Sequence, residues 1–375
     1  MKPIAVWSVA VVAAVLVATA AAAPPPVHAT SWLVENGATG EVLVSHDAQK
    51  RVPMASITKL MTVLVTLEHA KLSDVVTVSP QAAVVGESTI DLRPGERISV
   101  GDLVEAALIQ SANDAATALA AYVGGGSIPR FVGYMNAKAR ALGLAHTHFA
   151  NPSGLDAPHH FSSARDVTRL AQVLMQRAYV RSIVRRQTAS IEGGRTLHTW
   201  NDLLAASPAV IGVKTGHTNL AGWSEVAAAR EPGVTIYATI LGGPSRAQRN
   251  QDLSELLSWG LSRYRLVNAV DASRTYATVA TDYGRPSVRL VAPRSKLRVV
   301  RLGRPFVERV VAPTAVPLPV RKGERLGQVR VSEAGKLVAS SPLVADRSVT
   351  APGLGGKIRW YAGRTAHHLW EALTP

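Results

Sequence analysis

The sequence has no cysteine among its 375 residues. A catalytic thiolate, a disulfide bond and a cysteine-ligated metal site are therefore excluded. Without cross-links, the fold must be stabilised by burial of apolar side chains. A chain of this length is long enough for two or three domains with a sizeable core, so its size is compatible with an enzyme.

Aromatic and acidic residues are also scarce. Aromatic side chains make up 5% of the chain, and 26 acidic residues stand against 41 basic ones, for a formal net charge of +15. Surfaces that stack nucleic-acid bases interleave aromatic with basic residues, and this sequence shows no such pattern. No nucleic-acid partner is expected. The basic charge either stays solvated or faces anionic lipid and wall polymers outside the cell.

Residues 1–29 have the profile of a secretory leader, because Lys2 is followed by an apolar stretch, small residues and three prolines. We expect cleavage after Ala29, with Ala21–Ala23 as the alternative site. The apolar run is also long enough to span a bilayer, so an uncleaved anchor stays open. Both interpretations export the rest of the chain to the periplasm or to the extracytoplasmic face of the membrane.

Residues 30–266 show the pattern of one α+β domain. Apolar residues flank a Gly-rich turn within 31–47, which predicts a hairpin. Helical periodicity covers 56–123 and resumes after Ser162 and Ser163. Strand signals return between 209 and 243, and a last helix is expected to end near 266. This order predicts an antiparallel sheet packed against a cluster of helices.

The last third of the chain has a different texture. Short alternating runs separated by Pro and Gly predict a small all-β domain over 267–350. The pattern of residues 351–375 predicts an amphipathic helix with basic charge on its polar face. Its apolar face would carry Ile358, Ala362, Leu369 and Leu373. Such a helix can lie in a membrane interface, or it can pack on the β domain.

The stretch "MASITKLMT" places Ser56 and Lys59 three residues apart at the start of a helical pattern. A helix brings such residues onto one face, where a lysine that has lost its proton can activate the serine hydroxyl. Taken alone, Ser56 is better interpreted as the cap of an ordinary helix than as a nucleophile.

Two further triplets interrupt apolar segments with polar side chains. Ser111-Ala112-Asn113 breaks a helical pattern, and Lys214-Thr215-Gly216 ends an apolar strand. Gly216 would let a substrate backbone approach the strand edge closely. Separately, the two triplets also read as a capped helix break and as a surface turn.

In this order, S-x-x-K, S-x-N and K-T-G are the triplets of penicillin-binding proteins and serine β-lactamases. The chain resembles the low-molecular-mass penicillin-binding proteins that are exported D-alanyl-D-alanine carboxypeptidases. The likeness continues in "LIQSANDAA", "NPSGLDAPHHFSSARD", "GVKTGHTNLAGW" and "LLSWG", and in the β-rich domain and the amphipathic tail. It therefore extends over nearly all of the chain after the leader.

The resemblance implies roles for the first two triplets. Ser56 would be the acylated nucleophile and Lys59 its general base. Ser111 would relay the proton to the leaving D-alanine, and Asn113 would orient the substrate amide and Lys59. The oxyanion hole would use the backbone N–H groups of Ser56 and His217.

The resemblance also implies a binding site for the free chain end of the substrate. Lys214 would supply positive charge, and Thr215 would bind the terminal carboxylate. The family's carboxylate-anchoring arginine falls at Arg249 by its spacing from Lys214 and Trp259, with Arg246 as a close rival. A guanidinium suits this task because its donors match the two carboxylate oxygens.

The implied activity is a serine carboxypeptidase that removes the terminal D-alanine from peptidoglycan stem pentapeptides and is inhibited by β-lactams. Transpeptidation or endopeptidase action differs in the acceptor or the bond and stays open. A serine β-lactamase would need a carboxylate in an E-x-x-L-N-like segment between the second and third triplets, and "NPSGLDAPHH" stands there instead. A wall-binding protein without catalysis is the alternative from another class.

No metal or cofactor is expected. The histidine pairs at 159–160 and 367–368 could suggest a metal site. Adjacent side chains point apart on a helix or strand, however, and no third ligand stands at a suitable spacing.

Overall fold

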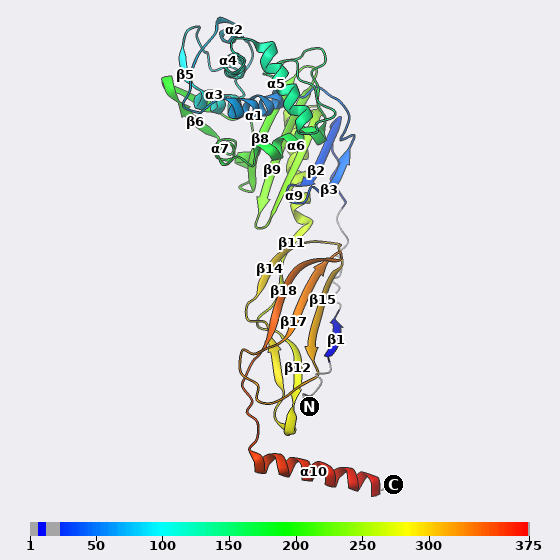
Figure 1. The fold of residues 1–375 in the computed structure, drawn as a ribbon. Helices are drawn as coiled ribbons and strands as arrows, with labels where there is room; N and C mark the ends of the chain where they lie inside the picture. Colours follow the sequence, from blue (N-terminus) through cyan, green and yellow to red (C-terminus); the bar gives the residue numbers. More distant parts are fainter. Residues whose placement is uncertain (1–6, 13–22, 374–375) are drawn as a thin grey trace. The chain divides into compact units, whose positions relative to one another are not determined.

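The computed structural model describes residues 7–12 and 23–373. The chain divides into two compact units, a larger one of residues 22–263 and a smaller one of residues 264–375 together with 1–21 (Figure 1). Residues 1–6 and 13–22 of the predicted leader lie outside the described residues. The described part of the leader includes Trp7–Val12, which forms strand β1 of the smaller unit. The leader and the domain boundaries stay predictions.

A five-stranded antiparallel sheet with the order β3-β2-β10-β9-β8 runs through the larger unit. The predicted hairpin is confirmed as β2 (Ser31–Asn36) and β3 (Val42–His46). The later strand signals form β8 (Val210–Thr218), β9 (Gly222–Glu231) and β10 (Val234–Gly243).

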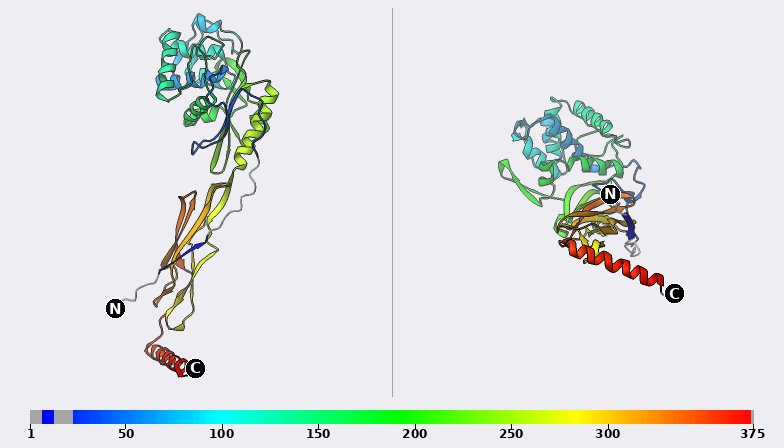
Figure 2. Two further views of the ribbon diagram at one scale, coloured as in Figure 1. Left: turned by 90° about the vertical axis from the view of Figure 1, so that its right-hand side faces the viewer. Right: turned by 60° about the horizontal axis from the view of Figure 1, so that its bottom comes forward.

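Helices cover both faces of this sheet. Thr168 of α6 and Thr239 of β10 share a hydrogen bond on one face, their hydroxyl oxygens 2.6 Å apart. On the other face Gly260 of α9 lies so close to Ile236 that an added Cβ would be 2.7 Å from Cγ2 of that residue. Thr239 and Ile236 are three residues apart on one strand, so their side chains point to opposite faces. Figure 2 shows this layering from two further directions.

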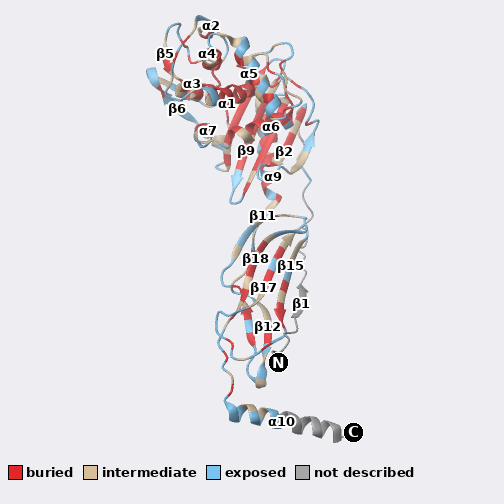
Figure 3. Ribbon diagram, in the orientation of Figure 1, coloured by how far each residue is buried: buried red, intermediate tan, exposed pale blue. Residues whose placement is uncertain are grey.

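The helical cluster lies on the α6 side and buries α1 at its centre (Figure 3). Its longer helices are α1 (Lys59–His69), α3 (Val100–Leu108), α4 (Asn113–Val123), α5 (Ile128–Ala141) and α6 (Ala164–Leu174). Of the two serines that precede this helical stretch, Ser163 is the N-cap of α6, and its hydroxyl accepts a hydrogen bond from Asp166 N. The predicted α+β fold is thus confirmed.

Shorter elements complete the larger unit. They are η1 (Ala55–Thr58), β4 (Val75–Thr77), α2 (Pro80–Ala83), β5 (Arg97–Ser99), α7 (Ala178–Ile183), β6 (Thr188–Ile191), η2 (Glu192–Gly194), β7 (Arg195–His198) and α8 (Leu203–Ala206). The helix expected to reach residue 266 was predicted too long, because α9 (Arg246–Ser262) is followed by a strand. That segment, "YRLVNAV", alternates in a way that suits a strand.

The smaller unit is built on a seven-stranded sheet with the order β1-β15-β17-β18-β13-β12-β16, beside the two-stranded pair β11-β14. Its strands after β1 are β11 (Tyr264–Val270), β12 (Thr275–Thr281), β13 (Val288–Val291), β14 (Lys296–Arg301), β15 (Phe306–Pro313), β16 (Ala315–Val316), β17 (Arg325–Glu333) and β18 (Lys336–Ala345), with η3 (Asp282–Gly284) after β12. Alternate residues of these strands form a separate apolar core.

The predicted C-terminal helix is confirmed as α10 (Leu354–Leu373). Among the described residues, no helix is both long and apolar enough to cross a bilayer. A role for α10 at a membrane surface stays a prediction.

Candidate active site

Ser56 lies in the short turn η1 immediately before helix α1. Its Oγ lies 2.7 Å from Lys59 Nζ, and no side-chain capping bond is present at the start of either helix. The preceding residue, Ala55, has a φ of 50°, which is uncommon outside glycine and turns the serine out of the regular chain path. Ser56 is therefore not a helix cap, and its hydroxyl is directed at the amine.

Lys59 is fully buried, with a relative exposure of 0%. Besides Ser56, its Nζ contacts Asn113 Oδ1 at 2.6 Å and the carbonyl oxygen of Ser153 at 2.7 Å. Burial lowers the pKa of Lys59 well below its ordinary value, the charge of Lys214 lowers it further, and more distant carboxylates oppose the shift. The environment favours a neutral amine whose polar contacts are all satisfied.

The second triplet lies where the predicted helical stretch divides into α3 and α4. Ser111 has a φ of 65°, and Asn113 is the first residue of α4. Asn113 donates from Nδ2 to Gly86 O at 2.9 Å and from its backbone N to Ser88 O at 2.7 Å. The break therefore serves the site, because it orients both polar side chains and fixes a neighbouring loop.

The third triplet is in strand β8. Lys214 Nζ donates to Ser111 Oγ at 2.9 Å and to Thr215 O at 2.8 Å, which joins the second and third triplets. A Cβ added to Gly216 would lie 3.0 Å from the backbone N of Ser56. Gly216 thus packs closely against the nucleophile turn and also lines the cavity. Its expected role of admitting a substrate backbone stays a prediction.

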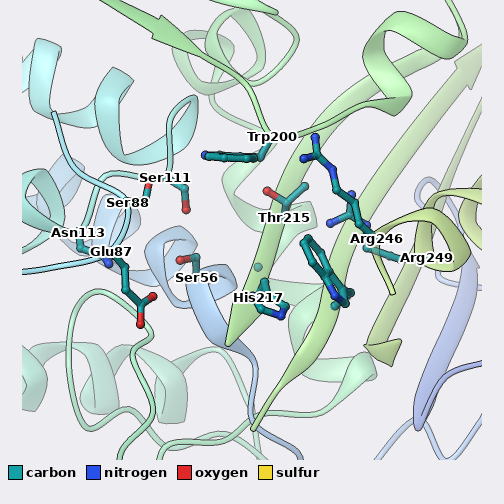
Figure 4. Close-up of a pocket in the computed structure, with 12 residues that line it drawn as sticks. Ser56, Glu87, Ser88, Ser111, Asn113, Trp200, Thr215, His217, Arg246 and Arg249 are labelled. Atoms are coloured by element: carbon teal, nitrogen blue, oxygen red, sulfur yellow. The ribbon is translucent and has the colours of Figure 1, made fainter. Parts of the chain in front are cut away.

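The three triplets face one cavity of about 220 Å³ (Figure 4). On one side of Ser56 the wall is formed by Asn113 and Glu87, and on the other side by Thr215 and the two predicted arginines. Segments far apart in the sequence thus meet at one hydroxyl.

Comparison with known proteins agrees with this geometry. Residues 18–245 match the model of the D-alanyl-D-alanine carboxypeptidase family. The chain belongs to this family. It is 32% identical to the D-alanyl-D-alanine carboxypeptidase DacC of Escherichia coli (strain K12), over 92% of this chain and 90% of that one.

Solved structures extend the likeness to both units. Penicillin-binding protein 5 of Haemophilus influenzae is 27% identical and matches with a TM-score of 0.64, over 88% of this chain and all of that one. The Streptomyces K15 DD-transpeptidase is 30% identical with a TM-score of 0.61, over 64% of this chain. Structures of the carboxypeptidase family therefore share the fold described above.

The match to the carboxypeptidase family model ends at residue 245, just before the two candidate arginines. Arg246 is bound by both carboxylate oxygens of Asp202, at 2.8 and 2.5 Å, and lies over the ring of Trp200. Arg249 is 2% exposed, its Nε lies 3.1 Å from Glu225 Oε2, and it also lines the cavity. Arg249 is engaged as well, because its Nε and Nη2 both donate to Asn250 Oδ1, at 3.1 and 2.5 Å. The choice of Arg249 as the carboxylate anchor therefore stays a prediction.

Glu225 is a residue of the site that our sequence analysis missed. It lies on β9 directly across from Thr215, and its exposure is 0%. Burial raises its pKa to about 7, while the charges of Arg249 and Lys214 oppose that shift. A lone carboxylate within the apolar strand "WSEVAAA" was the available signal, because such a group is costly to bury without a partner.

The same buried charges act on Lys214. Burial lowers its pKa to about 7, Glu225 acts to raise it, and Arg249 to lower it. His217, by contrast, is exposed and stacks on Trp223 with ring centroids 4.1 Å apart. This position is compatible with the prediction that His217 contributes only its backbone N–H group, to the oxyanion hole.

The two histidines of the pair at 159–160 have different surroundings, because His159 is exposed and His160 is buried. His160 is buried, and its Nε2 lies 2.7 Å from Thr58 Oγ1. Burial lowers its pKa to about 4, so the imidazole is neutral. Its contacts are those of a structural histidine beneath the nucleophile turn. The side chains of His367 and His368 lie outside the described residues.

Proposed function

We propose that the protein is a serine D-alanyl-D-alanine carboxypeptidase that releases the terminal D-alanine of peptidoglycan stem pentapeptides through an acyl-enzyme on Ser56. The observation that carries the proposal is the buried amine of Lys59, 2.7 Å from Ser56 Oγ. Membership of the family and the names of its relatives agree with this activity.

The contacts of Lys59 suit a general base. A neutral amine has two N–H groups and one lone pair. The two acceptors, Asn113 Oδ1 and Ser153 O, take the N–H groups. The lone pair then faces Ser56, whose O–H donates to it. As Ser56 Oγ attacks the carbonyl carbon of the penultimate D-alanine, its proton passes to Lys59 Nζ.

Expulsion of D-alanine needs a proton on the leaving nitrogen. Ser111 Oγ is held by Lys214 Nζ at 2.9 Å, so the hydroxyl can pass its proton to the departing amine. The proton that Lys59 took from Ser56 replaces it on Ser111, which returns Lys59 to the neutral amine. Water then attacks the ester on Ser56, with Lys59 again taking the proton. The backbone N–H groups of Ser56 and His217 are proposed to stabilise the oxyanion in both steps.

The terminal carboxylate of the substrate is proposed to bind beside Thr215, Lys214 and Arg249. This carboxylate adds negative charge next to Lys214, which raises the pKa of its ammonium group above the value of about 7 in the free site. Substrate binding and protonation of Lys214 are thus coupled.

β-Lactams would acylate the same serine, because they also present a strained amide and a carboxylate. Transpeptidation is the second candidate, since it uses the same acyl-enzyme with an amine in place of water. The likeness to a protein described as a DD-transpeptidase supports keeping it.

The protein is further proposed to act outside the cytoplasm, with residues 1–29 as a leader and 351–375 at the membrane surface. The proposed domains are 30–266 for catalysis and 267–350 for the β-rich part. Our support is the apolar leader and the amphipathic pattern of α10.

The deciding experiment measures D-alanine release from a synthetic pentapeptide and locates the adduct formed with a fluorescent penicillin. We expect release by the unaltered protein, none by Ser56→Ala, and an adduct on the peptide that contains Ser56. Normal release by Ser56→Ala would overturn the proposal. A single-turnover assay with an added amine acceptor compares hydrolysis with transpeptidation.

A further inference from the structure

The two ends of the active-site cavity carry opposite charges. Arg246 and Arg249 lie on one side of Ser56, and Glu87 lies on the other (Figure 4). Glu87 is exposed to solvent. Within the part of the chain that the structure describes, its carboxylate takes part in no hydrogen bond and no ion pair. The mechanism above assigns it no task.

The loop that carries Glu87 is firmly held. The carbonyl groups on either side of it, Gly86 O and Ser88 O, accept hydrogen bonds from Asn113 at 2.9 and 2.7 Å. Further along, Asp114 accepts from the backbone N–H groups of Ile90 and Leu92 at 3.1 to 3.2 Å. The backbone that carries Glu87 is therefore held at a defined place relative to Asn113.

Glu87 itself has a φ of 67°, a left-handed conformation that glutamate rarely adopts. Such a conformation is retained only when the surroundings impose it, and it is found preferentially at functional sites. Here it presents a charged side chain at the cavity wall, although a glycine would adopt the same backbone without strain. The position calls for a function of the charge itself.

The direction of the substrate supplies that function. A peptide with its terminal carboxylate at Arg249 and its scissile carbonyl at Ser56 must extend its acyl part away from the arginines. An extended chain advances about 3.3–3.6 Å per residue, so the third residue of the stem follows within about two residue lengths of Ser56. Its side chain then lies on the Glu87 side of the cavity.

We propose that Glu87 is a specificity residue that favours stem peptides whose third residue carries a free side-chain amine. This inference rests on the proposed carboxypeptidase function. The ion pair would form at a partly open site, where such pairs contribute modestly. We therefore expect the free amine to raise kcat/KM about fivefold over a neutralised amine at low ionic strength. Added salt reduces the preference.

A purely electrostatic effect on the chemistry is distinguishable from this role. The charge of Glu87 acts on Lys59 through space and favours its protonated form. An effect of that kind would alter kcat equally for all substrates. Recognition of an amine alters only the ratio between an amine-bearing substrate and its neutral analogue.

The test compares Nα-acetyl-L-lysyl-D-alanyl-D-alanine with its Nα,Nε-diacetyl analogue, using the full-length protein and D-alanine release at neutral pH. The unaltered protein should prefer the free amine about fivefold. Glu87→Gln should bring the ratio to about one, and Glu87→Lys should invert it. Glu192→Gln is the matched control, since Glu192 is exposed and lies outside the cavity, and it should keep the original ratio.

Three results would overturn the inference. One is a ratio near one in the unaltered protein, and another is a preference that survives Glu87→Gln. The third is an equal fall of kcat for both peptides in Glu87→Gln with an unchanged ratio. The proposed function is tested separately by release of D-alanine from the diacetylated peptide. The unaltered protein should show this release, and Ser56→Ala should not. If that release is absent, both proposals fail, whereas release with a ratio of one removes only the role of Glu87.

Discussion

Two buried lysines of the same candidate site are held in different ways. Lys59 has three neutral oxygen neighbours and no adjacent carboxylate, and its pKa lies well below the ordinary value. Lys214 shares its surroundings with Glu225 and Arg249, which leaves its pKa at about 7. The difference teaches that burial near a second cation favours a neutral base, whereas burial beside a carboxylate favours the ammonium form, which a substrate carboxylate can bind.

The same substitution at both lysines should separate these roles most strongly. We expect Lys59→Arg to lower the rate of acylation by a penicillin about 10³-fold, because a guanidinium cannot accept the proton of Ser56. Stopped-flow fluorescence measures the rate, and thermal unfolding checks the fold. Lys50→Arg, at an exposed site, is the control. Acylation within about tenfold of normal in Lys59→Arg would show that Lys59 is not the base.

The carboxylate anchor is the next largest expected effect. Arg249→Leu should remove the preference for a peptide with a free terminal carboxylate over its C-terminal amide, a loss of about 30-fold in that ratio, because a charge-assisted hydrogen bond disappears. Arg246→Leu should retain most of the preference, since Asp202 offsets the charge of Arg246, whereas burial raises the pKa of Glu225 beside Arg249 to about 7. The opposite ranking of the two variants would assign the anchor to Arg246.

Lys214→Arg preserves the positive charge and should therefore be milder than Lys59→Arg. We expect kcat/KM for a carboxylate-ended peptide to fall about tenfold, because the hydrogen bond of Lys214 Nζ to Ser111 is lost or distorted. Steady-state kinetics with the two arginine variants side by side measures the contrast. An equal loss of kcat/KM in Lys214→Arg and Lys59→Arg would contradict the proposed difference between the roles of the two lysines.

Glu225→Gln should give the smallest effect and the most specific one. The carboxylate raises the pKa of Lys214, so removing its charge lowers that pKa. If the ammonium form assists binding, kcat/KM declines as pH rises through this pKa, and the decline should begin at lower pH in the variant. Near pH 7 we expect about a threefold loss. Glu231→Gln, at the exposed end of the same strand, should leave the pH profile unchanged. An unshifted profile in Glu225→Gln would show that Glu225 does not tune Lys214.

Much of the fold was predictable because its signals are local. The hairpin at Ser31–His46, the cap at Ser163 and the strands after Val210 follow from turn residues, hydroxyl caps and apolar alternation. The end of α9 was misplaced, because no Gly or Pro stands between the last helical residue, Ser262, and the first residue of β11, Tyr264. The boundary between such segments depends on whether the side chains pack in the apolar core of the larger unit or in that of the smaller unit.

The site was predictable only in part. The three triplets have a recognisable order, but Glu87, Glu225 and Trp200 have no motif. Glu87 is one of many charged residues in polar loops, and its meaning depends on a left-handed backbone held by Asn113. Glu225 was visible as a charge in an apolar strand, but its partner Arg249 could not be named, because the pairing joins a strand to a distant helix.

The sequence by itself determined the chemical groups, the absence of thiol chemistry, the α+β pattern and the spacing that lets Ser56 and Lys59 share one turn. Only the tertiary structure decided the burial and the neighbours of the two lysines, the pairing of Arg249 with Glu225 and the opposite charges at the ends of the cavity. The physical reason is that a pKa and an ion pair depend on distance and on loss of water. Both are set by contacts between residues far apart in the chain.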